Sequence, residues 1–394
     1  MMSLARGISG PKTTPHPKDG IMQPQSTSPR KRILQTILAA VSIFNLAACL
    51  HDSDDPVTPE PPSTAFVFAV TSDYKSGSYS AVGLDSAFSR VGVEAIHSDA
   101  VTYYRGGDDI FILNRMMRDN LQVIDRRSLL TVMQIAFPAL SNPYDIAVKD
   151  SLLYVAFYGL DKILIYAQGD GSPQGEIDLS AYADSADGFA EASALRFVEG
   201  DLYVLTANLD SKTHGPPMPP HLLKIDIASR QVTAALELPF RNPASLTYDS
   251  AAGRFHIPCM GEYIHPDFSI NADGAILSVD LAAFAVADTL ITEAALGGNL
   301  NAALLHGGKL FLSLGTGSED RIVAISLADA EVEEVTSLGA YATGGMAIDA
   351  ATATLIVGDR AGKTLRRFDT DTFVENTAYR VPLNLPPASL AVIR

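Results

Sequence analysis

The chain has 394 residues, of which 47% are hydrophobic and 19% are charged, so it can bury a substantial core and is not an intrinsically disordered chain. Its formal net charge is −16 at pH 7, and because residues 1–48 hold six basic residues and one acidic residue, the remainder carries −21. A surface of that charge repels phosphate backbones, so we expect no nucleic-acid partner.

Residues 1–48 have the pattern of an N-terminal extension followed by a lipoprotein signal peptide. A basic triplet at 30–32 precedes an uncharged, mainly apolar run at 33–48, which is shorter than the roughly 20 residues that a membrane span needs. The run ends in Leu46-Ala47-Ala48-Cys49, which resembles a lipobox. That resemblance implies cleavage before Cys49 and acylation of its thiol. We therefore predict lipid anchoring to the outer membrane, with the domain facing the periplasm or the cell surface; an apolar anchor with a coincidental cysteine is the alternative.

Residues 49–64 follow the signal as an acidic, Pro-rich segment. This composition predicts an extended tether between the lipid and the domain. The only other cysteine, Cys259, would then have no disulfide partner.

Residues 65–394 contain a repeated strand pattern. Small or polar residues followed by an alternating apolar run recur at spacings of 45, 49, 51, 57, 43 and 44 residues. Such spacing is typical of propeller blades with four short strands. The segments begin at Asp99 (DAVTYY), Tyr144 (YDIAVK), Ser193 (SALRFV), Ala244 (ASLTYD), Asn301 (NAALLH), Gly344 (GGMAID) and Ala388 (ASLAVI).

The ends of this region complete one repeat between them. Each of the first six segments is followed by two further apolar runs, whereas the segment at 388 ends the sequence and the runs at 65 and 77 have no such segment before them. We therefore predict an all-β fold, a seven-bladed β-propeller closed by pairing of the C-terminal strand with the first blade. A β-helix would need shorter repeats, and an array of two sandwiches would not leave half a repeat at each end.

Two stretches carry a family resemblance. NPYDIAVKDSLLYVAFYGLDKILIYA at 142–167 and NLNAALLHGGKLFLSLGTGSEDRIVAISL at 299–327 resemble the YVTN repeats of YncE-like bacterial propellers. The resemblance implies the propeller fold for residues 65–394. Proteins with related architectures include surface lipoproteins that capture cobalamin or siderophores for an outer-membrane transporter. A group of lactonases shares the same blade pattern.

A ring of residues precedes the predicted inner strands at matching offsets. In propellers these positions lie on the face that carries the loops between second and third strands, so they would line a central funnel. Mostly neutral amides with one acid suit hydrogen-bonded recognition of a polar small molecule. The alternative is that Asn-Pro pairs in this set are turn formers. The set comprises His97, Asn142, Glu191, Asn242 and Asn299, with Thr343 and Pro386.

Two long loops, at 208–221 and 259–274, lie on the same predicted face in neighbouring blades. They bring together imidazole, thiol, thioether and carboxylate groups, which are ligands for copper or zinc. No paired Cys or His motif of a zinc site occurs, and Cys259 can equally be a small buried apolar residue. The candidate ligands are His214, His221, Cys259, Met260, Glu262 and His265, together with Met218.

No sequence motif indicates catalysis. The chain has no GxSxG elbow, HExxH motif or Gly-rich phosphate loop, and among the ring residues only His97 and Glu191 could act as a base. We therefore expect a propeller that binds a small molecule or an envelope protein without turning it over. A lactonase-like hydrolase and a scaffold for protein contacts are the alternatives.

Overall fold

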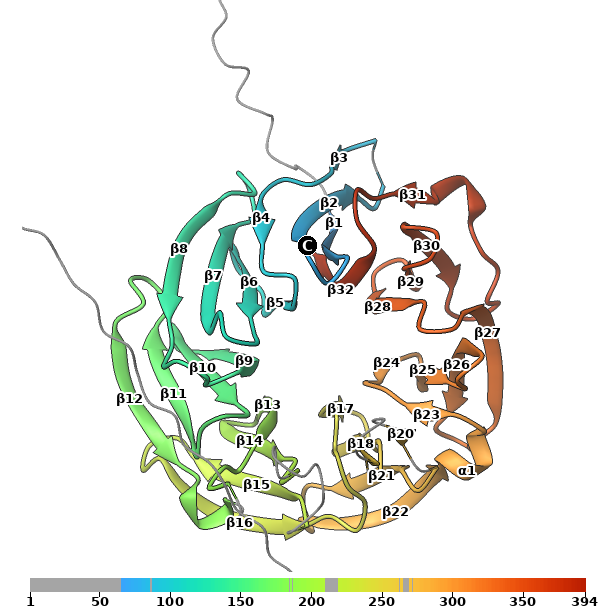
Figure 1. Ribbon diagram of the computed structural model, residues 1–394. Coiled ribbons are helices and arrows are strands. Elements are labelled where there is room, and N and C mark those ends of the chain that lie inside the picture. The colour runs from blue at the N-terminus through green and yellow to red at the C-terminus, as the bar shows by residue number, and fades with distance from the viewer. Residues whose placement is uncertain are drawn as a thin grey trace, which may run out of the picture. The chain divides into compact units, whose positions relative to one another are not determined.

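Each repeat of the sequence folds into one antiparallel sheet. The computed structural model describes residues 65–394 apart from 86, 184, 186, 210–218, 262, 265–268 and 271. Within these residues, seven sheets of four or five strands stand around a central axis as the blades of a propeller (Figure 1). The seven-bladed fold predicted from the repeats is confirmed.

The innermost strand of each blade coincides with one of the repeated segments. The side chains of these strands alternate between the two faces of the blade, so they point toward the preceding and the following blade. In blade order the inner strands are β32 (Pro387–Ile393), β5 (Ala100–Tyr104), β9 (Pro143–Lys149), β13 (Ala192–Val198), β17 (Thr247–Asp249), β24 (Leu304–His306) with β23 (Asn299–Leu300), and β28 (Thr343–Asp349).

The second and third strands are the apolar runs that follow those segments, and they are mostly buried because each blade is covered on both faces by its neighbours. The second strands are β1 (Phe66–Ser72), β6 (Asp109–Asn114), β10 (Leu152–Phe157), β14 (Asp201–Thr206), β18 (Arg254–Cys259), β25 (Lys309–Gly315) and β29 (Thr354–Asp359). The third strands are β2 (Gly77–Gly83), β7 (Asn120–Asp125), β11 (Lys162–Ala167), β15 (His221–Asp226), β21 (Ala275–Asp280), β26 (Glu319–Ser326) and β30 (Thr364–Asp369).

The outer strands are more exposed and less regular. In blade 1 the outer strand is divided into β3 (Ser89–Arg90) and β4 (Ala95–Ile96), both paired with β2. The others are β8 (Thr131–Ala136), β12 (Pro173–Asp178), β16 (Gln231–Glu237), β22 (Ala285–Thr292), β27 (Val332–Gly339) and β31 (Val381–Pro382). Short helical turns, η1 (Ser180–Tyr182), α1 (Glu293–Leu296) and η2 (Thr377–Tyr379), lie in connections, and the described residues include no helix long and apolar enough to cross a membrane.

The first blade joins the two ends of the propeller. Strand β32 pairs antiparallel with β1 from Phe66 opposite Ile393 to Val70 opposite Ser389. Strand β1 is buried along its whole length, because its even-numbered residues pack toward blade 2 and its odd-numbered residues toward blade 7. The predicted closure is confirmed, and it removes the free sheet edges that an open array would expose.

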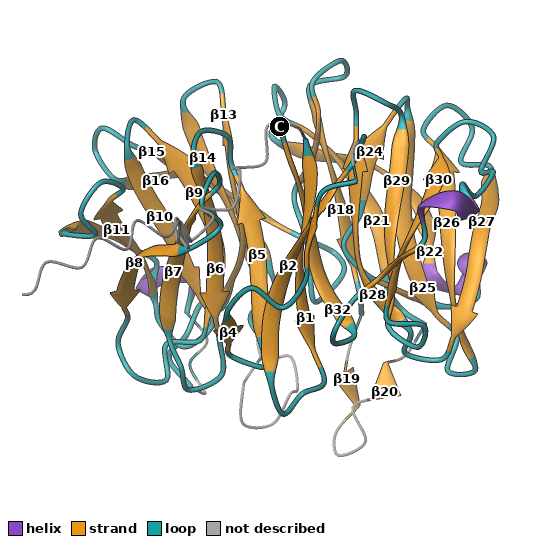
Figure 2. Ribbon diagram, turned by 90° about the horizontal axis from the view of Figure 1, so that it is seen from above, coloured by secondary structure: helices purple, strands orange, loops and turns teal. Residues whose placement is uncertain are grey.

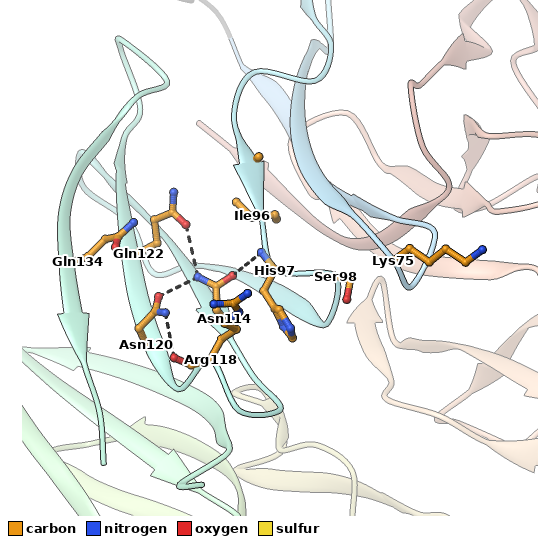
Figure 3. Close-up of a pocket in the computed structure, with 10 residues that line it drawn as sticks. Lys75, Ile96, His97, Ser98, Asn114, Arg118, Asn120, Gln122 and Gln134 are labelled. Atoms are coloured by element: carbon orange, nitrogen blue, oxygen red, sulfur yellow. Dashed lines mark hydrogen bonds between the residues drawn. The ribbon is translucent and has the colours of Figure 1, made fainter. Parts of the chain in front are cut away.

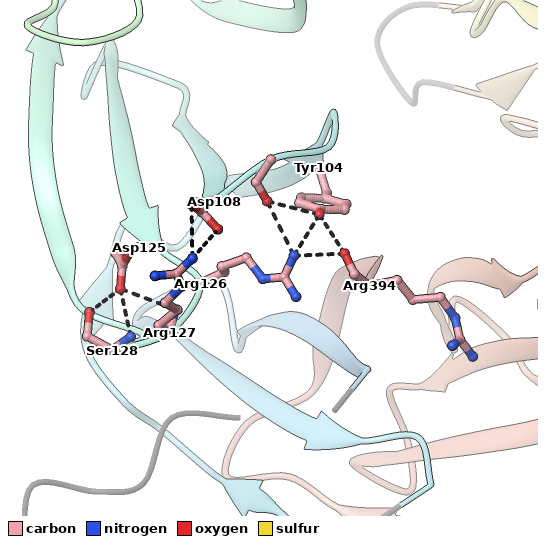
Figure 4. A network of polar contacts seen from close by, with 8 residues as sticks. Tyr104, Asp108, Asp125, Arg126, Arg127, Ser128 and Arg394 are labelled. Atoms are coloured by element: carbon pink, nitrogen blue, oxygen red, sulfur yellow. Dashed lines mark hydrogen bonds and ion pairs between the residues drawn. The ribbon is translucent and has the colours of Figure 1, made fainter. Parts of the chain in front are cut away.

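Polar contacts of the last residue strengthen this closure. The Arg394 carbonyl oxygen accepts hydrogen bonds from Tyr104 Oη at 2.9 Å and from Arg126 Nη1 at 2.8 Å, both from blade 2 (Figure 4). Its guanidinium makes a bidentate pair with Asp349 of blade 7, at 2.7 and 2.6 Å. Arg394 therefore ties blade 1 to both of its neighbours.

The core is divided into seven apolar clusters, one between each pair of neighbouring blades. This arrangement follows from the period of two in the strands, which sends alternate apolar residues to the preceding and the following blade. The fold therefore depends on packing between blades.

One end of the propeller, here called the loop face, carries both the connections between blades and the loops between second and third strands. The two kinds of segment meet there through a repeated backbone hydrogen bond. The N–H of the residue that follows a second strand donates to a carbonyl just before the inner strand, as from Tyr158 to Asn142 at 3.1 Å and from Met260 to Asn242 at 3.0 Å. The short hairpin of β19 (Tyr263–Ile264) and β20 (Ser269–Ile270) also projects from this end (Figure 2).

Candidate functional site

A cavity of about 730 Å³ opens on the loop face and is here called the funnel. Residues from blades 1, 2, 3, 5, 6 and 7 line it, so it lies where the inner ends of the blades converge. Its size is that of a small-molecule site. Its lining combines the guanidinium groups of Arg115 and Arg360 and the carboxylate of Asp320 with aromatic and thioether side chains.

Arg360 brings a positive charge to the funnel. It directly follows β29, and its side chain donates to the carbonyl oxygens of Pro387 at 2.8 Å and Ser72 at 3.2 Å. Its Cζ lies 4.6 Å from the centroid of the Tyr74 ring. None of the ion pairs formed between described residues includes Arg360. Neutral carbonyls orient its guanidinium without cancelling its charge, which leaves it able to attract an anion.

Arg115 occupies the equivalent position after β6. Its Nη2 pairs with Asp99 at 2.7 Å, and its Cζ lies 5.3 Å from the ring centroid of Tyr144, which stacks on Tyr158 with 3.9 Å between centroids. Burial lowers the pKa of Arg115, but Asp99 together with Tyr144 and Tyr103 raises it by more, so the side chain stays charged. Its Nε is buried and has no hydrogen-bond partner among the described residues.

Tyrosines stand at the mouth of the funnel. Tyr74 and Tyr341 both line it, and they are 73% and 82% exposed. Both have left-handed backbones, with φ of 65° and 55°, which is an unfavourable conformation for bulky residues. Such strained positions cluster at binding sites, where the fold holds a side chain in place for contact. The funnel thus offers aromatic surface beside fixed positive charge.

The ring residues predicted from sequence do not form one site. Asn299 and Thr343 line the funnel, whereas His97 lines a separate crevice between blades 1 and 2. The remaining four, Asn142, Glu191, Asn242 and Pro386, line neither cavity. The first three have left-handed backbones, with φ of 48°, 49° and 55°.

Two of these side chains accept hydrogen bonds from backbone N–H groups in the loops between second and third strands. Asn142 accepts a hydrogen bond from the Met116 N–H at 3.4 Å, and the Glu191 carboxylate accepts one from the Leu209 N–H. Asn242 is buried. The left-handed backbones of Asn142 and Asn242 fit the turn-forming role that the sequence left open for the Asn-Pro pairs. The role of all three residues in ligand binding stays a prediction.

The predicted metal ligands are only partly described. His214, Glu262 and His265, like Met218, lie outside the described residues. Cys259 ends β18 and is fully buried, which raises the pKa of its thiol and disfavours the thiolate.

The two other described candidates lie apart in the fold. His221 begins β15, where burial lowers the pKa of its imidazole and favours the neutral form, and Met260 lines the funnel. Within the part of the chain that the structure describes, no three His, Cys, Asp or Glu residues gather as a metal site would require. A copper or zinc site in these loops stays a prediction.

Sequence reasoning missed both arginines of the funnel. The signal that would have found them is their position, because each is the first residue after a buried second strand. A backbone hydrogen bond to the preceding connection fixes that position on the loop face, from Arg115 N–H to the Asp99 carbonyl at 3.0 Å and from Arg360 N–H to the Ala342 carbonyl at 2.8 Å.

Comparison with known proteins shows the fold alone. No family model and no curated protein sequence matches this chain. Among solved structures, a Bacteroides fragilis protein named as a 6-phosphogluconolactonase has a TM-score of 0.59 at 13% identity, over 84% of this chain and 99% of that one. Hydrazine synthase of Kuenenia stuttgartiensis has a TM-score of 0.56 at 14% identity, over 72% and 86%. Apo AztD of Citrobacter koseri has 0.52 at 11%, over 84% and 98%. At these identities the likeness establishes a β-propeller with distant structural neighbours and does not assign an activity.

Proposed function

We propose that this protein is a lipid-anchored envelope propeller of the YncE-like kind, whose funnel binds a small anionic molecule without chemical turnover. The observation that carries the proposal is the positively charged side chain of Arg360, which two backbone carbonyl oxygens hold in the funnel. The protein as a whole has a net charge of −16. A cation that is not neutralised in an acidic protein focuses the potential at that point and attracts anions to it.

The groups around Arg360 and Arg115 favour a ligand that is partly planar and apolar. Each guanidinium lies over a tyrosine ring, and Met260 and Met346 line the same cavity. Thioethers adapt to irregular apolar shapes, and guanidinium groups stack on planar groups while donating to carboxylates or phosphates. An anion with an aromatic or conjugated portion would use both features.

Outer-membrane location and anchoring through Cys49 belong to the same proposal. They are supported by the basic triplet, the short apolar run and the lipobox-like end of residues 30–49. In this arrangement the funnel would hold its ligand, or a ligand-bearing envelope protein, close to the membrane.

The test is a calorimetric titration of the full-length protein with benzoate, citrate and inorganic phosphate at low and high salt. We expect at least one of these anions to bind with an affinity that falls as salt rises, because exposed charges are screened. Arg360→Gln should weaken that binding by about tenfold or more, since a charge-assisted hydrogen bond is lost.

Arg127→Gln is the matched control, because Arg127 is an exposed arginine of blade 2 that does not line the funnel. An equal loss in both variants, or no binding of any of the three anions, would contradict the proposal. Turnover of a lactone such as 6-phosphogluconolactone by the wild-type protein would replace simple binding by hydrolysis.

A further inference from the structure

We infer that a crevice between blades 1 and 2, separate from the funnel, binds the ring of an acidic sugar. The crevice has a volume of about 360 Å³ and opens on the loop face. Four carboxamide side chains from three successive strands of blade 2 form one wall (Figure 3). They are Asn114 of β6, Asn120 and Gln122 of β7, and Gln134 of β8.

One of these amides stands at a position that is apolar in four other blades. Gln122 pairs with Ile112 of β6, and the same register in blades 3 to 6 carries Leu164, Leu223, Leu277 and Val323. Blades 7 and 1 have Arg366 and Ser80 at this register. Gln122 is only 4% exposed, so a buried polar side chain occupies a position that is apolar in blades 3 to 6. The preceding blade is also unusual here, because its outer strand is reduced to the two-residue strands β3 and β4.

Hydrogen bonds orient three of the four amides, Asn114, Asn120 and Gln122. Asn114 Nδ2 donates to Asn120 Oδ1 at 2.9 Å, while Asn114 Oδ1 accepts from the His97 N–H at 3.1 Å. Gln122 Nε2 donates to Thr131 Oγ1 at 2.5 Å. Each carboxamide has two donor hydrogens and an acceptor oxygen, so these contacts use only part of the capacity of the set.

A wall of oriented neutral donors and acceptors matches the hydroxyl groups of a sugar, each of which both donates and accepts a hydrogen bond. A purely structural network would have no need of the open volume beside it. The imidazole of His97 and the hydroxyl of Ser98, which line the opposite side, add further polar groups.

Two cations at the mouth indicate that the sugar is acidic. Lys75, from the loop between β1 and β2, and Arg118, from the loop between β6 and β7, both line the crevice, whereas no carboxylate does. None of the ion pairs between described residues includes either of them. A uronic acid, with a ring of hydroxyls and one carboxylate, satisfies both the amides and the cations.

The test is a calorimetric titration of the full-length protein with D-glucuronate, D-glucose and acetate. We expect saturable binding of glucuronate, and binding of glucose or acetate at least about tenfold weaker, because each of those probes satisfies only half of the site. A further titration with trigalacturonate distinguishes the two possible sources of the ligand, a polysaccharide and a free sugar acid. Tighter binding of the trimer indicates the end of an acidic polysaccharide, and tighter binding of glucuronate indicates a free sugar acid.

Two variants locate the binding in the crevice. Gln122→Leu installs the residue found at this position in three other blades, and it should weaken glucuronate binding about tenfold while the thermal unfolding midpoint is kept. Arg118→Gln changes an exposed side chain and should weaken glucuronate more than glucose.

Arg360→Gln is the control for the funnel and should leave the glucuronate affinity unchanged. Loss of glucuronate binding in that variant, or glucuronate binding that survives both Gln122→Leu and Arg118→Gln, would place the sugar elsewhere and overturn the inference. Because anion binding in the funnel is measured with other probes and another variant, either site can fail without the other.

Discussion

At the scale of single residues, the clearest electrostatic feature is Glu375, which follows β30. Its carboxylate accepts two hydrogen bonds from Arg366, at 3.0 and 2.7 Å, and two from Arg380, both at 2.7 Å. These hydrogen bonds lower the pKa of Glu375 from 4.5 to about 2. The ionised carboxylate is therefore stabilised in the folded protein.

This shift predicts a pH-dependent contribution to stability. A carboxylate whose folded pKa is depressed stabilises the fold above its unfolded pKa, and that contribution disappears as the pH falls from 4.5 toward 2. We expect Glu375→Gln to lower the free energy of unfolding at pH 7 by about 1–2 kcal/mol, after allowing for solvent screening. Urea unfolding of both proteins from pH 7 to pH 2 measures the difference, which should shrink toward zero at the acid end. A difference that stays constant with pH would show that the ion pairs do not cause it.

The residues of the candidate site were only partly predictable, for a physical reason. The offset before each inner strand correctly located the connections between blades, but it could not show that Asn142 and Asn242 use left-handed backbones to make the turn. Asn adopts that conformation more readily than most residues, so its presence in a connection fits a turn as well as a binding role. Arg115 and Arg360 could not be recognised from the sequence, because only the folded propeller brings them into one cavity with Tyr144 and Tyr74.

At the scale of strands, the contact that best tests the architecture is the pair of Arg394 with Asp349. Burial raises the pKa of Asp349, but hydrogen bonds from Arg394 and Thr352 lower it by more, so the fully buried carboxylate is held ionised. Arg394→Ala would leave that charge without its bidentate partner.

We expect this substitution to cost about 1–2 kcal/mol in the free energy of unfolding measured by urea denaturation. It leaves the buried Asp349 carboxylate without its partner, and solvent reduces the cost because the Arg394 side chain is 42% exposed. Arg127→Ala breaks an exposed arginine–aspartate pair with Asp108 and should change the stability by less than about 0.5 kcal/mol. Equal effects of the two substitutions would mean that Arg394 does not help to close the ring.

Strands differ in how well the sequence predicts them. The second and third strands and most inner strands were predicted at their observed places because two covered faces require a run of apolar residues. The inner strand of blade 5 is shorter than its predicted segment at 244–249, since it runs only from Thr247 to Asp249. The outer strands lack that requirement. Five of the six residues of β12 are exposed, and β16 alternates between exposed and half-buried residues. The outer strand of blade 1 and the hairpin of β19 and β20 were not predicted, because each of their strands has only two residues and forms no apolar pattern.

At the scale of the whole molecule, export and anchoring are the properties that the fold does not address. The lipobox-like sequence predicts that cells fed a labelled fatty acid will incorporate it into the wild-type protein. Cys49→Ser removes the thiol that would be acylated, so the variant should be unlabelled and should leave the membrane fraction. Cys259→Ser is the control, because that thiol is buried in the propeller. Labelling of the Cys49→Ser protein would exclude this cysteine as the anchor.

The pairing of Phe66 with Ile393 also orders the events of folding. Blades 2 to 7 are each built from a continuous stretch of chain, so they can assemble as soon as their residues are available. Blade 1 must wait for the final strand, since the entropic cost of bringing such distant segments together is recovered only when that strand docks. In a cell that secretes the chain N-terminus first, the beginning of the domain would reach the far side of the membrane early and remain unpaired until translocation ends. Chaperones would be needed most during that interval. A chain without its last eight residues would leave β1 with an unpaired, aggregation-prone edge, and we expect it to be degraded.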